Sequence, residues 1–324
     1  MAKIPVRTID ANTGDFFKDF KDCIVKDNTG GPGVVSTGSI SFDDATGIGG
    51  IPRGRITELF GMYSSSKTTL ALHLIANAQK LGLSCVFIDN ERSLSKSYAQ
   101  LLGVNLKKLK TVEFDTLEQT LQAIFQFNCE PTNKDSVIVW DSIGLTPMHS
   151  ELHSQIDKSH MGDRAQLLWV HSRRIAGPAK RNNILNLYLN QTTESFSPYE
   201  QFVTPGGHGL EHTTSMRVQV IRGQKQAIKV NNVAQEPWGV AINFTTNKNK
   251  CSVPHKKTQC ILRFGVGYDS IYEVIERSIN KKIIVQKGTW LSYEDKNIAQ
   301  GKEKLRAKFE EDHKFFEKIK GLVT

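Results

Sequence analysis

The sequence predicts an α/β protein built on a mostly parallel sheet that is covered by helices. Three observations predict this fold class. From about Ser36, short β-type runs alternate with helical stretches, as in a sheet whose parallel strands are joined by crossover helices. A turn rich in serine and threonine (Gly61–Thr69) stands between one such strand and a helix. Two further strands end in an aspartate, at Asp89 and Asp141.

The elements of this sheet are assigned from apolar runs that are bounded by turn residues. The helix that follows the turn is expected to span Thr68–Leu81. The expected strands are Arg55–Phe60, Ser84–Asp89, Ser136–Asp141, Ile184–Asn190, Met216–Ile221 and Val240–Thr245.

We expect three parts along the chain. Residues 1–33 form an N-terminal helical arm for oligomerisation, because a helical apolar stripe there has no partner nearby in the sequence. Residues 34–268 form the core of the α/β fold. Residues 269–324 form a small C-terminal α/β domain, because the chain changes there to short mixed elements rich in lysine and glutamate. The stripe of the arm consists of Phe16, Phe17, Phe20, Cys23 and Ile24.

Composition excludes several classes of protein. The chain has 324 residues, 39% of them apolar and 23% charged, as in an ordinary globular protein. Its five cysteines show no Cys-x-x-Cys spacing, so we expect reduced thiols rather than a disulfide framework or a zinc site. No apolar run reaches the ~18–20 residues that span a bilayer, and the N-terminus lacks a secretory signal. We therefore expect a cytoplasmic protein with no membrane partner. The formal charge of +9 favours a polyanionic partner.

The run Gly61–Thr69 has the context of a Walker A loop, since it follows a strand and opens a helix. Consecutive backbone N–H groups and the positive end of the helix dipole would hold phosphates there. We expect Lys67 to reach the β- and γ-phosphates of ATP and the Thr68 hydroxyl to bind Mg²⁺. The residues expected to contact the nucleotide in this run are Gly61, Ser64, Ser65, Ser66, Lys67, Thr68 and Thr69.

Ser66 departs from the Walker pattern, which has a glycine just before the lysine. If the backbone at this position requires φ > 0, a serine costs about 1 kcal/mol or more. A serine-rich helix N-terminus with a chance lysine is the alternative interpretation. The flanking strand and helix and the later motifs favour nucleotide binding, while fast turnover is a separate question.

Acidic residues beyond two strands form a candidate metal and catalytic centre. Asp141 ends an apolar strand, where it can hold Mg²⁺ or its water as a Walker B residue. Glu91 lies just beyond the strand that ends at Asp89, and a carboxylate there can orient and deprotonate the attacking water. Each acid alone could be a capping or solvated residue. Their joint placement at strand ends favours a functional site.

Further motifs follow in a fixed order from about Ser36 to about Lys308, which is most of the chain. These motifs are Ser36-Thr37-Gly38-Ser39, Gly49-Gly50-Ile51-Pro52-Arg53-Gly54-Arg55, Phe87-Ile88-Asp89-Asn90-Glu91, Leu102-Gly103-Val104, Val139-Trp140-Asp141-Ser142, Leu145-Thr146-Pro147, Ser159-His160-Met161-Gly162, Asn190-Gln191, Gly206-Gly207, Lys248-Asn249-Lys250 and Gln300-Gly301-Lys302. A chance match to the Walker pattern is common, but this ordered set is not. Together with the Walker loop, the set resembles the bacterial RecA recombinases. The resemblance implies a RecA-type P-loop ATPase core.

The resemblance implies roles for several single residues. Glu91 would be the catalytic carboxylate, and Tyr98 would stack on the adenine ring. Gln191 would sense the γ-phosphate and pass that state to the loop after it. Lys248 and Lys250 would project from one subunit into the ATP site of the next, for which a Lys-x-Lys pair at a strand end is suited. On the sequence alone, a solvated basic turn is an equal alternative for these lysines.

The resemblance also implies two loops that contact single-stranded DNA. The first corresponds to Ser154–Arg164. The second corresponds to Thr192–Gly209, a long segment with aromatic residues, glycines and no periodicity. A disordered surface loop is the alternative interpretation of the second segment. This segment carries no lysine or arginine, so its phosphate contacts must come from backbone amides. Basic residues on the first loop and on the helix that follows it can add to these contacts. The residues expected to contact DNA are Met161, Gly162, Arg164, Arg173, Phe202, Gly206 and Gly207.

The resemblance implies that the protein would be an ATP-dependent homologous recombinase and a DNA-dependent ATPase. It would use ATP and Mg²⁺, form a homo-oligomeric helical filament on single-stranded DNA, and pair that strand with homologous duplex DNA. Two alternatives stay open. One is an ATP-binding filament protein on single-stranded DNA with little hydrolysis, suggested by Ser66. The other is a ring helicase built on the same fold.

Overall fold

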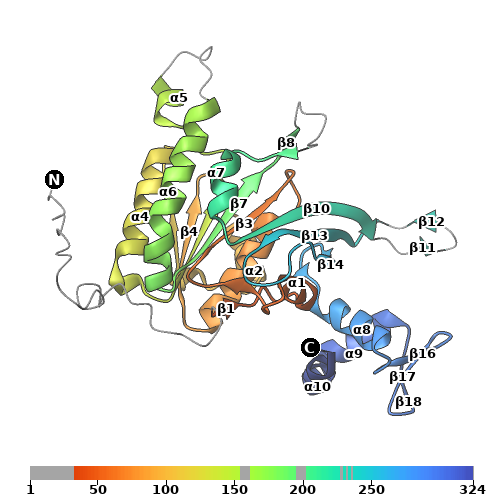
Figure 1. Ribbon diagram of the computed structural model, residues 1–324. Helices are drawn as coiled ribbons and strands as arrows, with labels where there is room; N and C mark the ends of the chain where they lie inside the picture. The colour runs from red at the N-terminus through yellow and green to blue at the C-terminus, as the bar shows by residue number, and fades with distance from the viewer. Residues whose placement is uncertain are drawn as a thin grey trace. The chain divides into compact units, whose positions relative to one another are not determined.

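A nine-stranded mixed sheet organises most of the described chain (Figure 1). The computed structural model describes residues 33–153, 161–194, 202–226, 229–230, 233–234 and 236–323. The expected N-terminal arm lies outside these residues apart from Gly33, as do the first part of the first expected DNA loop, 154–160, and the central part of the second, 195–201. Within the described ranges, no helix is both long and apolar enough to cross a bilayer.

The strand order of the sheet is β15-β14-β13-β10-β3-β7-β6-β4-β5. The strands from β10 to β5 run parallel, and β13, β14 and β15 are antiparallel to their neighbours. The predicted mostly parallel α/β fold is therefore confirmed. The strands are β3 (Ile56–Gly61), β4 (Ser84–Asp89), β5 (Leu109–Val112), β6 (Ser136–Asp141), β7 (Leu185–Gln191), β10 (Met216–Gln226), β13 (Gly239–Asn249), β14 (Lys257–Arg263) and β15 (Gly267–Tyr268).

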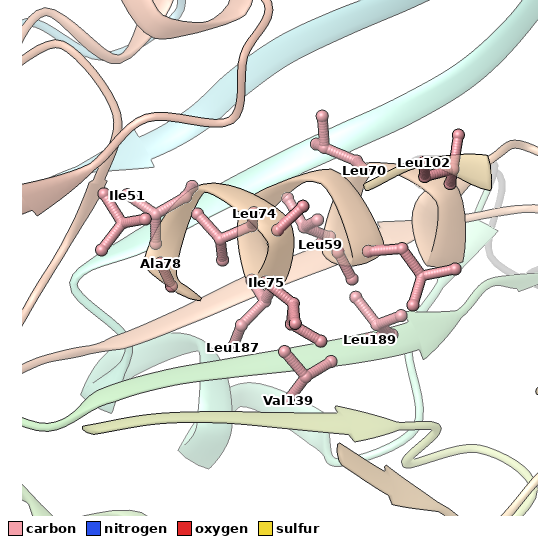
Figure 2. Packing of buried hydrophobic residues seen from close by; sticks show 14 of the residues in the cluster. Ile51, Leu59, Leu70, Leu74, Ile75, Ala78, Leu102, Val139, Leu187 and Leu189 are labelled. Carbon is pink, nitrogen blue, oxygen red and sulfur yellow. The ribbon is translucent and has the colours of Figure 1, made fainter. Parts of the chain in front are cut away.

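The helix α2 (Lys67–Lys80) covers one face of this sheet. Its apolar residues recur at helical spacing, and most of them are buried in one cluster with residues from the parallel strands. Figure 2 shows Ile75 of this helix directed toward Leu187 and Val139 on neighbouring strands. Full burial of such a side chain stabilises the fold by roughly 1.5–3 kcal/mol. This packing fixes the start of α2 against the end of β3.

The helices α4 (Leu117–Cys129) and α6 (Met161–Arg181) share a second cluster with the opposite face of the same strands. Successive strand residues point to opposite faces, so Val139 belongs to the α2 cluster and Trp140 to the α4–α6 cluster. The Trp140 ring meets Tyr188 edge-on, with ring centroids 5.2 Å apart. Burial on both faces explains why these strands are continuously apolar in the sequence.

The C-terminal elements surround a third cluster of buried residues. This cluster also contains Ile40 of α1 (Ile40–Thr46). The carboxylate of Glu273 accepts hydrogen bonds from the Ser39 hydroxyl at 2.7 Å and the Ser41 N–H at 3.1 Å, at the start of α1. Polar contacts and apolar packing therefore join these elements to α1. They are α8 (Ser270–Asn280), β16 (Val285–Lys287), β17 (Trp290–Tyr293), β18 (Lys296–Gln300), α9 (Lys302–Glu311) and α10 (His313–Val323).

The smaller elements connect the sheet strands and helices. They are β1 (Val34–Val35), β2 (Ile51–Pro52), α3 (Lys96–Leu101), α5 (His149–His153), β8 (Thr193–Glu194), β9 (Phe202–Val203), β11 (Lys229–Val230), β12 (Val233–Ala234) and the 3₁₀ turns Leu106–Lys108 and Pro131–Asn133.

The expected second DNA loop, Thr192–Gly209, contains the short strands β8 and β9 and the start of a helix, which corrects the prediction of a long loop without regular structure. The helix α7 (Gly207–Thr213) begins inside that range, after Gly206, whose φ of 112° is accessible chiefly to glycine. A Cβ at Gly209 would lie 2.5 Å from the Cβ of Trp169, so the absent side chain lets α7 approach α6 closely. The segment is too short for its periodicity to predict this helix.

Candidate nucleotide and DNA site

The turn between β3 and α2 has the backbone geometry of a phosphate loop. Ser64 and Ser66 both have left-handed backbones, with φ of 54° and 68°. The condition under which a serine at position 66 is costly, φ > 0, is therefore met. Ser66 is the N-cap residue of α2, but its hydroxyl donates to the Ser65 carbonyl oxygen at 2.6 Å and does not cap the helix. The N–H groups of the first turn are thus left to an anion.

The strain at Ser66 leads to a first testable prediction. Replacement of Ser66 with glycine should raise the free energy of unfolding by about 0.5–1 kcal/mol, because glycine adopts this backbone without a Cβ penalty. Denaturant unfolding measures the difference. Ser97→Gly is the matched control, since Ser97 lies exposed in the ordinary helix α3, and there the same change should lower stability. A loss of stability in Ser66→Gly would contradict the argument.

Lys67 lies inside the turn rather than in solvent. Its Nζ donates to the carbonyl oxygens of Gly61 at 3.0 Å and Met62 at 2.9 Å, and to the Ser65 hydroxyl at 3.3 Å. Burial lowers the pKa of Lys67, and the nearby carboxylates of Asp141 and Glu91 oppose that shift. A largely buried ammonium group held mainly by neutral carbonyl oxygens favours an anion as its further partner.

Thr68 and Asp141 lie together, as the sequence predicted for two oxygen ligands of one metal ion. The Thr68 Oγ1 donates to Asp141 Oδ2 at 2.6 Å. Burial raises the pKa of Asp141, and the Thr68 hydrogen bond counters this shift. A hydroxyl and a carboxylate that face each other beside a phosphate loop form a donor set that suits Mg²⁺.

Glu91 follows β4, and its backbone N–H donates to the Asp141 carbonyl oxygen at 3.2 Å. The pairing of β4 with β6 sets Asp89 opposite Asp141, so the residues after both strands share one edge of the sheet. The carboxylate of Glu91, whose side chain is half-buried, raises the pKa of Lys67 and so opposes the effect of burial. The structure therefore brings the expected base to the edge that holds the Walker loop.

Tyr98 and Gln191 flank the same loop on two sides. Tyr98 lies in α3, with its hydroxyl 3.3 Å from Thr69 Oγ1. Gln191 ends β7 in register with Gly61, and the N–H of the next residue, Thr192, donates to the Gly61 carbonyl oxygen at 3.2 Å. Both expected side chains are half-buried and lie next to the turn.

Lys248 and Lys250 lie at the end of β13, where both ammonium groups meet the C-terminal end of α7. Lys248 Nζ donates to the carbonyl oxygens of Glu211 and His212, the latter at 2.9 Å, and Lys250 Nζ donates to the His212 oxygen at 3.1 Å. Burial, then the charges of Lys250 and Arg217, lowers the pKa of Lys248 to about 8. The two lysines thus point in one direction, toward the helix that follows the second loop.

The residues expected to contact DNA lie on three elements. Met161 and Gly162 begin α6, Phe202 lies in the two-residue strand β9, and Gly206 and Gly207 open α7. The strand β9 pairs with β8 across the central part of the second loop, which lies outside the described residues. The second loop therefore has a short antiparallel stem.

The two arginines expected near DNA, Arg164 and Arg173, differ in how many of their guanidinium groups' hydrogen bonds are already used within the protein. The guanidinium of Arg164 donates to the carbonyl oxygens of Ile143 at 3.1 Å and Thr146 at 2.7 Å, and pairs with Glu151 at 2.9 Å. It therefore braces the segment after β6, and a phosphate contact would have to compete with these bonds. Arg173 is exposed on α6 and stacks over the Trp169 ring, 4.2 Å from its centroid.

A buried polar network that includes Glu58 of β3, the strand before the Walker loop, was not predicted. Glu58 of β3 is fully buried and bonds to Arg217 of β10 and Asn190 of β7. The sequence does contain a signal, because an acid in the apolar run Ile56–Phe60 and a base in the run Met216–Ile221 are each unfavourable when buried without a partner. An acidic and a basic residue within two apolar strands of one sheet therefore predict an ion pair between those strands.

Fold and site define the class of this protein. A mostly parallel sheet carries a strand–turn–helix phosphate loop, and an acidic residue ends a nearby parallel strand, as in P-loop ATPases. Comparison with known proteins is more specific. The RecA N-terminal domain family matches residues 21–269, and the RecA C-terminal domain family matches residues 272–324.

Individual relatives agree with the family match. Protein RecA of Thermus aquaticus is 34% identical over 292 residues, which cover 90% of this chain and 84% of the relative. Protein RecA of Phytoplasma mali (strain AT) is 36% identical over 275 residues, covering 84% and 80%. Protein RecA of Aquifex aeolicus (strain VF5) is 34% identical over 290 residues, covering 88% and 81%. The chain belongs to the RecA family of recombinases.

Proposed function

We propose that this RecA-family recombinase binds ATP and Mg²⁺ at the turn Gly61–Thr69 and hydrolyses ATP at the contact between neighbouring protomers of a helical filament. The filament forms on single-stranded DNA and pairs it with a homologous duplex. The observation that supports the nucleotide site best is the joint position of Lys67, Thr68 and Asp141, with an ammonium, a hydroxyl and a carboxylate at the start of α2.

Each residue of the turn has a distinct task in this proposal. Lys67 exchanges its carbonyl partners for the β- and γ-phosphates, while the N–H groups at the start of α2 hold the remaining phosphate oxygens. Thr68 and Asp141 would hold Mg²⁺ through a hydroxyl and a carboxylate. An ion held there would supply positive charge that offsets the charge of the phosphates. Tyr98 stacks on the adenine ring beside Thr69.

Glu91 is the proposed general base. A carboxylate at this edge can accept a proton from water as the water attacks the γ-phosphate. Gln191 contacts the γ-phosphate and reports its presence to the second loop. Its place at the end of β7, in register with Gly61, supports this role.

Lys248 and Lys250 complete the site of the adjacent protomer in this proposal. Their common direction supports the role, since two ammonium groups at one strand end can engage one triphosphate. Within the protomer they bond to the end of α7, so a move toward a neighbouring triphosphate would change the helix that follows the second loop. DNA binding and hydrolysis would then depend on filament assembly.

We place the DNA interface at the two loops and at α6. The second loop uses backbone amides at Gly206 and Gly207, and Phe202 stacks on bases. Arg173 adds charge from α6, on the same helix as Met161 and Gly162. For the division of the chain we propose an oligomerisation arm at 1–33, the ATPase core with its DNA loops at 34–268, and a small C-terminal domain at 269–324.

A filament that binds ATP and DNA with little hydrolysis is a second candidate, favoured by the strained Ser66. ATP turnover with and without single-stranded DNA separates the two, because the recombinase predicts DNA-stimulated turnover and the static filament predicts none. A ring helicase is disfavoured, since the match to the RecA C-terminal domain family extends to residue 324.

The position of the lysines across the protomer contact leads to a second prediction. Lys67→Ala and the double variant Lys248→Ala, Lys250→Ala should each lose DNA-stimulated hydrolysis, whereas a mixture of the two should regain part of it. In a random equal mixture, about a quarter of the head-to-tail contacts join an intact turn to intact lysines. Hydrolysis is measured over a series of mixing ratios. Absence of recovery at every ratio, in mixtures that electron microscopy shows to assemble on single-stranded DNA, would contradict the shared site.

A further inference from the structure

A buried glutamate lies within β3, the strand that precedes the Walker loop. Glu58 in β3 is fully buried, and a carboxylate in such a place is unfavourable unless it is paired and hydrogen-bonded. Its Oε2 accepts a hydrogen bond from Arg217 Nε at 2.6 Å, and its Oε1 accepts one from Asn190 Nδ2 at 2.8 Å. These side chains link β3, β7 and β10 through one network.

Arg217 also binds α7 and the part of the second loop that directly precedes this helix. Its Nη2 donates to the Thr204 hydroxyl at 3.1 Å, before α7, and its Nη1 lies 2.6 Å from Glu211 Oε1, on α7. The guanidinium stacks over the Phe60 ring, 4.6 Å from its centroid. A planar group with five fixed donors can bind Glu58, Thr204 and Glu211 at once, whereas a lysine ammonium cannot match these directions.

Asn190 makes a parallel connection to the loop. Its Nδ2 donates to Glu58 and also to the Pro205 carbonyl oxygen at 2.8 Å. A flip of this amide would turn Oδ1 toward the Glu58 carboxylate, so the charge on Glu58 fixes the amide orientation. Asn190 directly precedes Gln191, the proposed γ-phosphate contact. A shift at the end of β7 would therefore move the donor that holds Pro205.

We propose that Arg217, held in place by Glu58, is a positioning residue that couples nucleotide state to Thr204 and Pro205, which follow the β8–β9 stem of the second DNA loop. Arg217 donates to Thr204 and Asn190 donates to Pro205, and the same buried carboxylate accepts a hydrogen bond from each of these two donors. Loss of the guanidinium geometry leaves the phosphate loop intact but removes the bond that ties Thr204 to the sheet. The inference rests on the proposed function, because it assigns the γ-phosphate contact to Gln191 and DNA contact to the second loop.

The test compares the affinity of the full chain for a single-stranded oligonucleotide in the presence of a slowly hydrolysed ATP analogue and of ADP. The ratio of the two affinities measures the coupling. In Arg217→Lys this ratio should fall about fivefold or more, since ordinary coupling between sites is about 5–150-fold. Affinity for the analogue without DNA should stay unchanged, because Lys67 and Thr68 are not altered.

Arg306→Lys is the matched control. Arg306 and Arg217 have the same side-chain exposure, 11%, and each pairs with a buried carboxylate, Asp269 and Glu58 respectively. Both variants should lose thermal stability, but only Arg217→Lys should lose coupling. Equal loss in both would show a general effect of destabilisation and overturn the proposal.

A milder variant keeps the test decisive if Arg217→Lys does not fold. Thr204→Val removes only the hydroxyl that accepts from Arg217 and should also lower the affinity ratio. A parental ratio in Thr204→Val, or in a folded Arg217→Lys, would overturn the positioning role. If the parent itself binds DNA equally with the analogue and with ADP, the proposed function fails instead, so the two failures are distinguishable.

Discussion

Lys67→Ala is expected to lower ATP hydrolysis by about 10²–10³-fold, the usual effect of removing one preorganised charge-stabilising group from an active site. The ammonium is already held in the turn by the carbonyl oxygens of Gly61 and Met62, so little reorganisation is needed before it contacts phosphates. Nucleotide affinity should fall with it, since the charge contacts the ground state too. Nucleotide-dependent assembly on single-stranded DNA should be lost, as measured by electron microscopy with ATP.

Lys80→Ala is the control for this variant, because Lys80 ends the same helix and is exposed. It should leave hydrolysis and assembly close to those of the parent. If Lys67→Ala assembled on DNA and bound the oligonucleotide as the parent does, with or without nucleotide, the proposed nucleotide site would be wrong. Unfolding measurements on both variants separate loss of function from loss of fold.

The strands near the site could be predicted because their environment leaves a simple signal. Ser84–Asp89 and Ser136–Asp141 are buried on both faces, so they read as apolar runs with a polar end, and their observed bounds are those expected. Outer segments carry no such signal. β10 continues to Gln226 rather than ending at Ile221, and the added residues are mostly exposed and polar. Pairing with β13 extends this strand, and the residues of one strand alone do not reveal which other strand it pairs with.

Polar side chains were harder to assign because their partners are distant in the sequence. The DNA contact of Arg164 stays a prediction, and the structure adds that its guanidinium donates to the Thr146 carbonyl oxygen and to Glu151. The choice between a phosphate and an internal acceptor depends on which carbonyl oxygens the fold brings near. Spacing does not encode this, whereas Lys67 and Thr68 could be assigned because their geometry is local to one turn.

Glu91→Gln is expected to separate ATP hydrolysis from nucleotide and DNA binding more clearly than any other variant. Glutamine has nearly the same shape as glutamate but cannot accept a proton from the attacking water, so hydrolysis should fall by about 10²–10⁴-fold. Nucleotide binding and nucleotide-dependent DNA binding should persist, because Lys67, Thr68 and Asp141 are unchanged. Steady-state phosphate release and oligonucleotide binding with ATP measure the two properties in the same sample.

Glu113→Gln is the control for this variant, since Glu113 is an exposed acid that pairs with Arg92 at 3.6 Å. Its hydrolysis should match the parent. Each of the two substitutions removes one negative charge. If hydrolysis depended only on the overall charge, both variants would hydrolyse ATP more slowly. If Glu91 accepts the proton from water, only Glu91→Gln would do so. Near-parental turnover in Glu91→Gln would assign the base to another group at this edge, and Asp89 is a poor substitute, because its oxygens accept the N–H groups of Ser93 and Leu94 at 3.2 and 3.1 Å.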